Sequence, residues 1–249
     1  MLGGGAFEAG FWGLVAGSAL IIGAVFGYYL KLSPRVIGSV LAFGAGVLIS
    51  VLAFDLIEEA YEASDLVITG VSFVTGAVIY TLVNIYLERR GADDRMSAEQ
   101  EPASQDNGLV IAAGALLDGI PESIVIGLSL LYGGTVSAVA VIAIFVSNIP
   151  EGMSSAAGMR SAGRRPRYVF GVWIGIAVAS GIAAMLGYAV FGGLPVEVTA
   201  AMLALAAGGV LAMVADTMIP EAFESAHEFT GLIAVAGFLV AFVLSKLGG

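Results

Sequence analysis

Five polar residues lie inside two consecutive apolar segments of the sequence, and their types could bind a cation. They are Asp118, Glu122, Ser147, Asn148 and Glu151. A charged side chain at membrane depth costs about 2.5–3.5 kcal/mol on insertion scales, so three carboxylates together approach about 10 kcal/mol. Protonation could offset this cost, because a carboxyl group removed from water favours its neutral form. A bound cation would also offset this cost, and cation binding would then be the function of the buried carboxylates.

Helical spacing favours the cation. Asp118 and Glu122 are four residues apart, so on a helix they share one face. Ser147 and Glu151 have the same spacing in the next segment. Each pair can therefore point at a single place beside its helix.

A proline precedes each of the two glutamates. Pro121 and Pro150 cannot donate a backbone hydrogen bond, which frees the carbonyl oxygens of Leu117 and Val146 at membrane depth. Each Pro-Glu step thus supplies a carboxylate beside unpaired oxygen, and two steps on antiparallel neighbouring helices would make an oxygen-rich cation site. A single proline in a membrane helix is often only a kink, so this interpretation depends on the two steps occurring together.

The composition predicts helices that cross a membrane. Of the 249 residues, 59% are hydrophobic and only 12% are charged, and the mean hydropathy is +0.97. Apolar runs of 20 or more residues fit membrane helices, whereas barrel strands would alternate over about ten residues. The absence of cysteine excludes disulfides and thiolate metal sites. We expect an all-α membrane protein with eight transmembrane helices, over residues 7–30, 36–63, 66–88, 108–132, 135–159, 168–191, 196–224 and 230–247.

Basic residues predict the orientation of these helices. Nine of the ten Lys and Arg residues fall on one side of the eight segments: Lys31, Arg35, Arg89, Arg90, Arg95, Arg160, Arg164, Arg165 and Arg167. By the positive-inside rule this side is cytoplasmic, so both termini are extracellular. Residues 89–107 form a polar cytoplasmic loop after the third segment, and residues 1–249 form a single transmembrane domain.

Two internal repeats indicate an inverted architecture. Residues 41–62 align with residues 203–224 at an offset of 162, and the most informative part is Ile-Glu-Glu-Ala-Tyr-Glu against Ile-Pro-Glu-Ala-Phe-Glu. Residues 119–123 and 148–152 also match, at an offset of 29. With the orientation above, the members of each pair run in opposite directions. Inverted-repeat transporters place their binding site where the repeats meet, near the middle of the membrane.

Acidic residues also gather at the ends of the two long repeated segments. Asp55 and Glu59 lie near the end of the first, and Asp216 and Glu221 lie near the end of the second. Two interpretations are open: these are simply solvated helix ends, or they are steps of a transport path with an acidic vestibule at each mouth. The single histidine, His227, is interpreted as a surface residue.

Rows of small residues are expected to be close packing faces between helices. Gly23 and Gly27 form one such row, and Gly171, Gly175 and Ala179 form another. Small side chains let two backbones approach closely in a membrane.

In its two Pro-Glu segments the chain resembles the ZIP family (Zrt/Irt-like metal transporters), in the prokaryotic and GufA-like branch. The family pattern His-Asn-x-Pro-Glu-Gly is matched by residues 118–123, and the pattern His/Gln/Ser, then Asn/Asp/Glu, then x-Pro-Glu-Gly is matched by residues 147–152. The resemblance covers nearly the whole chain, including eight spans, outside termini and the cytoplasmic loop. It implies passive or coupled influx of zinc, iron or manganese through a mononuclear or binuclear site between the fourth and fifth spans.

The sequence departs from the family pattern at the site itself. Asp118 stands where the family has its metal-binding His, and Gly119 stands where it has Asn. The span over residues 168–191 contains no carboxylate, so a second metal position is incomplete, and the loop over residues 89–107 has no His cluster. The remaining ligands are all oxygens. Because zinc prefers nitrogen and sulfur while manganese, magnesium and calcium suit oxygen, we hypothesise a preference for harder cations.

The expected function is therefore transport of a divalent metal cation across the cell membrane, with Glu122 and Glu151 as bridging ligands. The ion is a substrate, no cofactor is expected, and the protein is not expected to be an enzyme. A net charge of −10 argues against nucleic acid as a partner, and a homodimer stays open. The alternative is a non-transporting ZIP-like metal sensor or degenerate homologue. An aspartyl protease built on Asp118 and Asp216 is a remote third interpretation, since the Gly-x-Gly-Asp motif is absent.

Overall fold

The described part of the chain is almost entirely helical. The computed structural model describes residues 2–92, 107–133 and 138–248. Within these ranges there are helices of α, π and 3₁₀ type and no strand. The all-α fold class expected from the sequence is therefore confirmed for this part. Of the predicted loop over residues 89–107, residues 93–106 lie outside the described residues, and residues 89–92 extend a helix instead of a loop.

The described part of the chain contains ten α-helices and four short segments of π- or 3₁₀-helix. The elements are α1 (Leu2–Tyr29), α2 (Pro34–Val51), η1 (Leu52–Leu56), α3 (Ile57–Glu62), α4 (Leu66–Leu87), η2 (Glu88–Ala92), α5 (Asn107–Gly133), α6 (Ala138–Ser161), α7 (Pro166–Phe191), α8 (Val196–Met213), η3 (Val214–Met218), α9 (Ile219–Ala226), η4 (His227–Phe229) and α10 (Thr230–Gly248). Among the described residues, seven helical segments are long and apolar enough to cross a membrane, which supports the expectation of a membrane protein.

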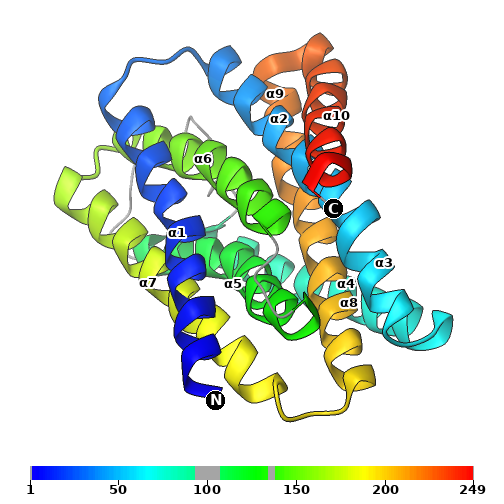
Figure 1. Cartoon of the computed structure of the whole chain (residues 1–249). Coiled ribbons are helices and arrows are strands. Elements are labelled where there is room, and N and C mark those ends of the chain that lie inside the picture. The colour runs from blue at the N-terminus through cyan, green and yellow to red at the C-terminus, as the bar shows by residue number, and fades with distance from the viewer. Residues whose placement is uncertain (1, 93–106, 134–137, 249) are drawn as a thin grey trace.

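The seventh of these segments folds back on itself. It runs over Val196–Leu247, 52 residues, which as a straight helix would measure about 78 Å against about 30 Å of hydrocarbon. The chain reverses at His227, whose φ of 53° is left-handed, and α10 then lies beside α2 (Figure 1). His227 is exposed, as the sequence predicted.

Helix starts follow from local capping residues. Ser33 caps α2 and is followed by Pro34, whose fixed φ suits a first helical turn. Asp65 caps α4, where its carboxylate accepts from the backbone N–H groups of Val67 at 2.7 Å and Ile68 at 2.9 Å. The acidic side chain of Asp65 therefore has a structural role as the N-cap of α4.

The long sequence repeat corresponds to a repeat of structure. Both α2 and α8 have 18 residues, and each continues into a five-residue π-helical segment, η1 or η3. Every boundary of these elements agrees at the offset of 162 residues. In Figure 1, α2 and α8 run in opposite directions, which is the orientation that an inverted repeat requires.

Matching glycines support the same symmetry. A side chain on Gly46 of α2 would collide with the carbonyl of Ala234 in α10, and a side chain on Gly208 of α8 would collide with the carbonyl of Phe73 in α4. Gly46 and Gly208 are equivalent residues of the repeat. The partner helices supply reciprocal contacts, Gly237 against Phe43 and Gly76 against Leu205. Through these glycines α2 packs against α10, and α8 packs against α4, so each repeated helix contacts the long helix that follows the other one.

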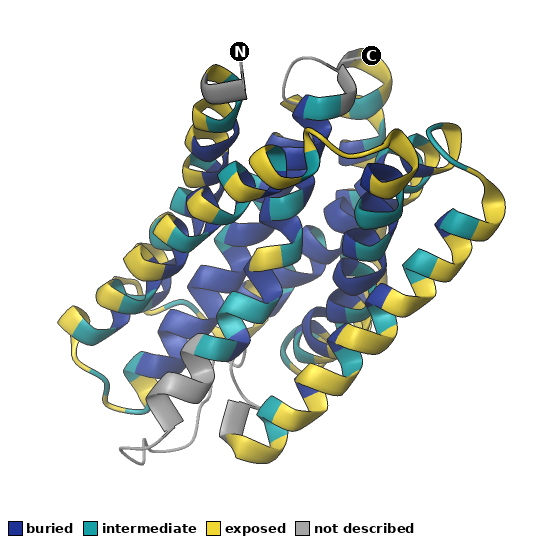
Figure 2. Ribbon diagram, turned by 90° about the horizontal axis from the view of Figure 1, so that it is seen from below, coloured by how far each residue is buried: buried dark blue, intermediate teal, exposed yellow. Residues whose placement is uncertain are grey.

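The helices form two groups that meet in the middle of the molecule. The α1 group contains α1, α5, α6 and α7, and the α2 group contains α2, α3, α4, α8, α9 and α10, with packing strongest inside each group. The groups touch chiefly where α6 meets α2 and where α5 meets α8. Buried residues concentrate on the central helices, while the outer faces are exposed (Figure 2).

Candidate cation-binding site

Helix α5 carries two buried carboxylates at the centre of the molecule. Pro121 lies inside α5 without ending it. Asp118 is 1% exposed and Glu122 is 2% exposed, and the two lie near enough to interact electrostatically. The structure thus brings these two predicted site residues together on one helix face.

Asp118 is held by a residue from the α2 group. The Tyr80 hydroxyl of α4 donates to Asp118 Oδ1 over 2.7 Å, and the same hydroxyl lies 3.3 Å from the hydroxyl of Thr217 in η3. All three side chains are buried. Asp118 is therefore linked to α4 by this hydrogen bond, and Tyr80 in turn contacts the π-helical segment after α8.

Glu122 has a different environment. Neither of its carboxylate oxygens has a hydrogen-bond partner among the described residues, and both are buried. The neighbouring Ser123 hydroxyl donates instead to the Gly119 carbonyl, at 2.6 Å. An ionised carboxylate without a partner is among the costliest groups to bury, so a cation beside Glu122 would offset that cost.

Helix α6 carries the second set of predicted ligands. Ser147, Asn148 and Glu151 are all buried, at 0%, 4% and 4% exposure. The Ser147 hydroxyl donates to the Ile144 carbonyl at 3.0 Å. Asn148 Nδ2 donates to the Ala16 carbonyl of α1 at 3.0 Å, and its Oδ1 is buried with no hydrogen bond to a described residue. Asn148 therefore faces α1, not α5.

The carboxylates of the two ligand sets do not gather into one group of three among the described residues. Among the residues that the structure describes, no three His, Cys, Asp or Glu side chains lie close enough to hold one metal ion. The expected convergence of Asp118, Glu122 and Glu151 is thus not seen, because α6 packs mainly on α1 and α2 whereas α5 packs mainly on α7 and α8.

Glycines explain why α6 follows α1. A side chain on Gly23 would collide with the Ile149 carbonyl, and a side chain on Gly152 would collide with the Leu20 carbonyl. The predicted packing row of Gly23 and Gly27 is confirmed by these contacts. The row of Gly171 and Gly175 was wrongly assigned to packing, since no described residue of another helix would lie within 4 Å of a side chain added at either position.

The four candidate path residues lie outside this buried centre. Asp55 of η1 is half-buried, accepts from the Ser245 hydroxyl at 2.8 Å and has a buried Oδ2 without a partner among the described residues. Asp216 of η3 is exposed and accepts from the Thr81 hydroxyl at 3.3 Å. Glu59 and Glu221 are both half-buried. Each aspartate therefore lies in a π-helical segment and accepts a hydrogen bond from a long neighbouring helix, Asp55 from α10 and Asp216 from α4.

Sequence reasoning missed Tyr80 and Thr217. A signal for Thr217 was available, because it is the repeat equivalent of Asp55 at the offset of 162. Tyr80 could have been noticed as an aromatic residue with a polar tip inside an apolar helix, since a buried tyrosine hydroxyl usually has a partner.

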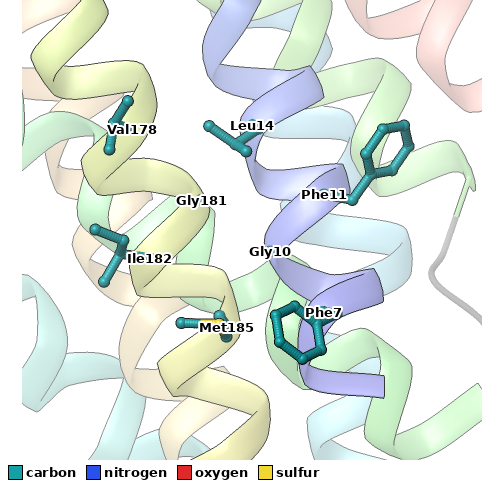
Figure 3. A pocket seen from close by; sticks show the side chains of 8 residues that line it. All are labelled: Phe7, Gly10, Phe11, Leu14, Val178, Gly181, Ile182 and Met185. Atoms are coloured by element: carbon teal, nitrogen blue, oxygen red, sulfur yellow. The ribbon is translucent and has the colours of Figure 1, made fainter. Parts of the chain in front are cut away.

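An apolar groove lies apart from these polar groups. It has a volume of about 320 Å³ between α1 and α7 and is lined by side chains such as Phe7, Leu14 and Ile182 (Figure 3). The lining contains no charged side chain, so the groove offers no ligand to a cation and suits the apolar part of a lipid.

No protein-family model matches the chain, and no curated protein matches it. The grounds for a function are therefore the motifs, the fold and the side-chain geometry.

Proposed function

We propose that this protein is a ZIP-like transporter of divalent metal cations, of the zinc, manganese and iron class, in the cell membrane. The observation that carries the proposal is Glu122, which is 2% exposed and has two carboxylate oxygens without partners among the described residues. Asp118 lies one turn away on the same helix face. A divalent cation is the ligand that such a pair would attract most strongly in a medium of low dielectric constant.

The proposed topology has eight crossings and extracellular termini. In this proposal the 52-residue segment, in which the chain turns back at His227, supplies two crossings, for a total of eight. At the end of the molecule that carries most of the basic residues, Arg160 Nη1 donates to the carbonyls of Tyr28 and Leu30, both at 2.9 Å. These bonds hold the end of α1 against the end of α6. The positive-inside rule assigns that side to the cytoplasm.

Transport in this proposal is a relative movement of the two helix groups. Asp118 of α5 accepts a hydrogen bond from Tyr80 of the α2 group. Ser147 of α6 lies beside Gly44 of α2. A shift of the α1 group against the α2 group would expose the buried carboxylates first to one side and then to the other. Glu122 and Glu151 are the proposed bridging ligands, with Asp118, Ser147 and Asn148 completing the shell.

Uptake into vesicles tests the proposal. Replacing Glu122 or Glu151 with Ala is expected to abolish uptake of the cation while the protein stays folded, and Glu8→Ala, at an exposed position of α1, is the matched control. Uptake that survives both changes would refute the site. Cation binding without any uptake by the unmodified protein would instead favour the metal-sensor alternative. In that alternative, Asp118 in place of the His of the ZIP pattern prevents transport but still allows the cation to bind.

A further inference from the structure

The Tyr80 hydroxyl occupies a position between two partners on different helices. It lies 2.7 Å from Asp118 Oδ1 and 3.3 Å from Thr217 Oγ1. Tyr80 is 2% exposed, Asp118 1% and Thr217 8%. Asp118 belongs to the α1 group, whereas Tyr80 and Thr217 belong to the α2 group, so this cluster bridges the interface along which the two groups would move.

The distances indicate which partner receives the proton. A phenol has a single proton to donate, and an O–H to carboxylate distance near 2.7 Å is typical of a charge-assisted bond, roughly twice as strong as a neutral one. Tyr80 therefore donates to Asp118, and the Thr217 hydroxyl can donate to the Tyr80 oxygen.

A cation would compete with Tyr80 for Asp118. The carboxylate oxygen that accepts from Tyr80 is also one that a cation at Asp118 and Glu122 would engage. Losing an acceptor normally leaves a buried donor unsatisfied, which is unfavourable. Here the Thr217 oxygen is already 3.3 Å away, so Tyr80 can turn its proton to Thr217 and avoid most of that cost.

We propose that Tyr80 is a positioning residue that exchanges its hydrogen bond to Asp118 for one to Thr217 when the cation binds. The exchange breaks the hydrogen bond between α5 and α4 and strengthens the one between α4 and the π-helical segment η3. Cation binding therefore removes a hydrogen bond between the two helix groups. This inference rests on the proposed function. The segment η3 suits such a role, because the Ile219 N–H bonds to the Val214 carbonyl in a π turn, and π turns occur frequently at functional sites.

The exchange predicts opposite effects for two conservative substitutions. Tyr80→Phe removes the competing donor, so the dissociation constant for Mn²⁺ is expected to fall about tenfold. Thr217→Val removes the second acceptor, so the dissociation constant is expected to rise several-fold. In the double variant there is no tyrosine hydroxyl left to move, so the loss of the acceptor at position 217 should have no further effect, and the affinity is expected to equal that of Tyr80→Phe alone.

The experiment is a calorimetric titration of the purified full chain with Mn²⁺, together with Mn²⁺ uptake into vesicles and a thermal melt of each variant. Tyr86→Phe is the matched control, since Tyr86 is an exposed tyrosine on the same helix. We also expect Tyr80→Phe to lower the maximal uptake rate, because tighter binding without the exchange slows release.

The outcomes separate this inference from the function on which it rests. If the unmodified chain binds no divalent cation, the proposed function fails and the inference falls with it. If the unmodified chain binds Mn²⁺ but Tyr80→Phe binds it equally or more weakly, Tyr80 is a structural residue or a direct ligand, and the inference alone is overturned. Should Tyr80→Phe fail to fold, an unchanged dissociation constant in Thr217→Val would overturn it equally.

Discussion

Asp118 and Glu122 lie one turn apart on the buried face of α5, but their environments differ. Tyr80 donates a 2.7 Å hydrogen bond to Asp118, while the carboxylate oxygens of Glu122 accept none from the described residues. The Asp118 carboxylate is thus held by a hydrogen bond from the protein, while the Glu122 carboxylate is available to bind a cation. This difference assigns Glu122 the central place in the proposed cation site.

Replacing Glu122 with Gln should separate stability from binding. The amide keeps the shape of the side chain but cannot ionise, so the free energy that burying an ionisable group costs is recovered, and without metal the free energy of unfolding is expected to rise by about 1–2 kcal/mol. Uptake should fall to background. Thermal melts with and without Mn²⁺ measure both effects, and the unmodified protein alone should gain stability from the metal. A Gln variant that is less stable without metal and still stabilised by it would contradict this assignment.

The chemistry of the ligands predicts the preferred metal. Every proposed ligand, including Asp118 in place of the family His, is an oxygen, and oxygen ligands suit manganese better than zinc. We expect Mn²⁺ uptake to proceed at least as fast as Zn²⁺ uptake when each is supplied at the same free concentration. Competition between the two metals in one vesicle preparation measures the ratio. A strong preference for zinc would remove the hard-cation hypothesis.

The close contact between α8 and α4 predicts that two glycine substitutions have very different effects on stability. In Gly208→Ala the new methyl group would meet the Phe73 carbonyl, and such overpacking typically costs about 1–3 kcal/mol. Gly70→Ala lies on the partner helix α4, where nothing is within 4 Å, and it should be neutral or stabilising by up to about 1 kcal/mol. Melting temperatures in one detergent compare the two. Equal melting temperatures would show that the repeat contact is not as close as described.

The topology can be tested with single cysteines, because the chain has none of its own. Arg165 and Gly193 flank α7 at opposite ends, and both are exposed. On intact cells a membrane-impermeant maleimide should label Gly193→Cys, and should label Arg165→Cys only after permeabilisation. The reverse pattern would invert the proposed orientation.

The helices themselves were predictable from the sequence. The apolar segments over residues 36–63 and 196–224 correspond to α2 through α3 and to α8 through α9, because charged residues and prolines bound these segments. The offset of 162 residues also reappears as equal element boundaries. Periodicity and capping act locally, so sequence reasoning can recover such features.

The neighbours of each helix were less predictable. Helical spacing predicted that Ser147 and Glu151 share one face of their helix, but not that the neighbouring Asn148 would donate to Ala16 of α1. The two glycine rows also look alike in the sequence, yet Gly23 makes a close contact and Gly175 makes none. Which helix covers a given face depends on contacts between distant segments, and no local pattern carries that information.

Anomalous scattering from crystals soaked in manganese tests the central claim most directly. We predict a manganese peak within ligand distance of Glu122, with Asp118 or Glu151 as a second carboxylate. Manganese bound elsewhere, for example only at the exposed acidic end of α3, with none beside Glu122, would contradict the claim that this buried carboxylate exists to bind a cation.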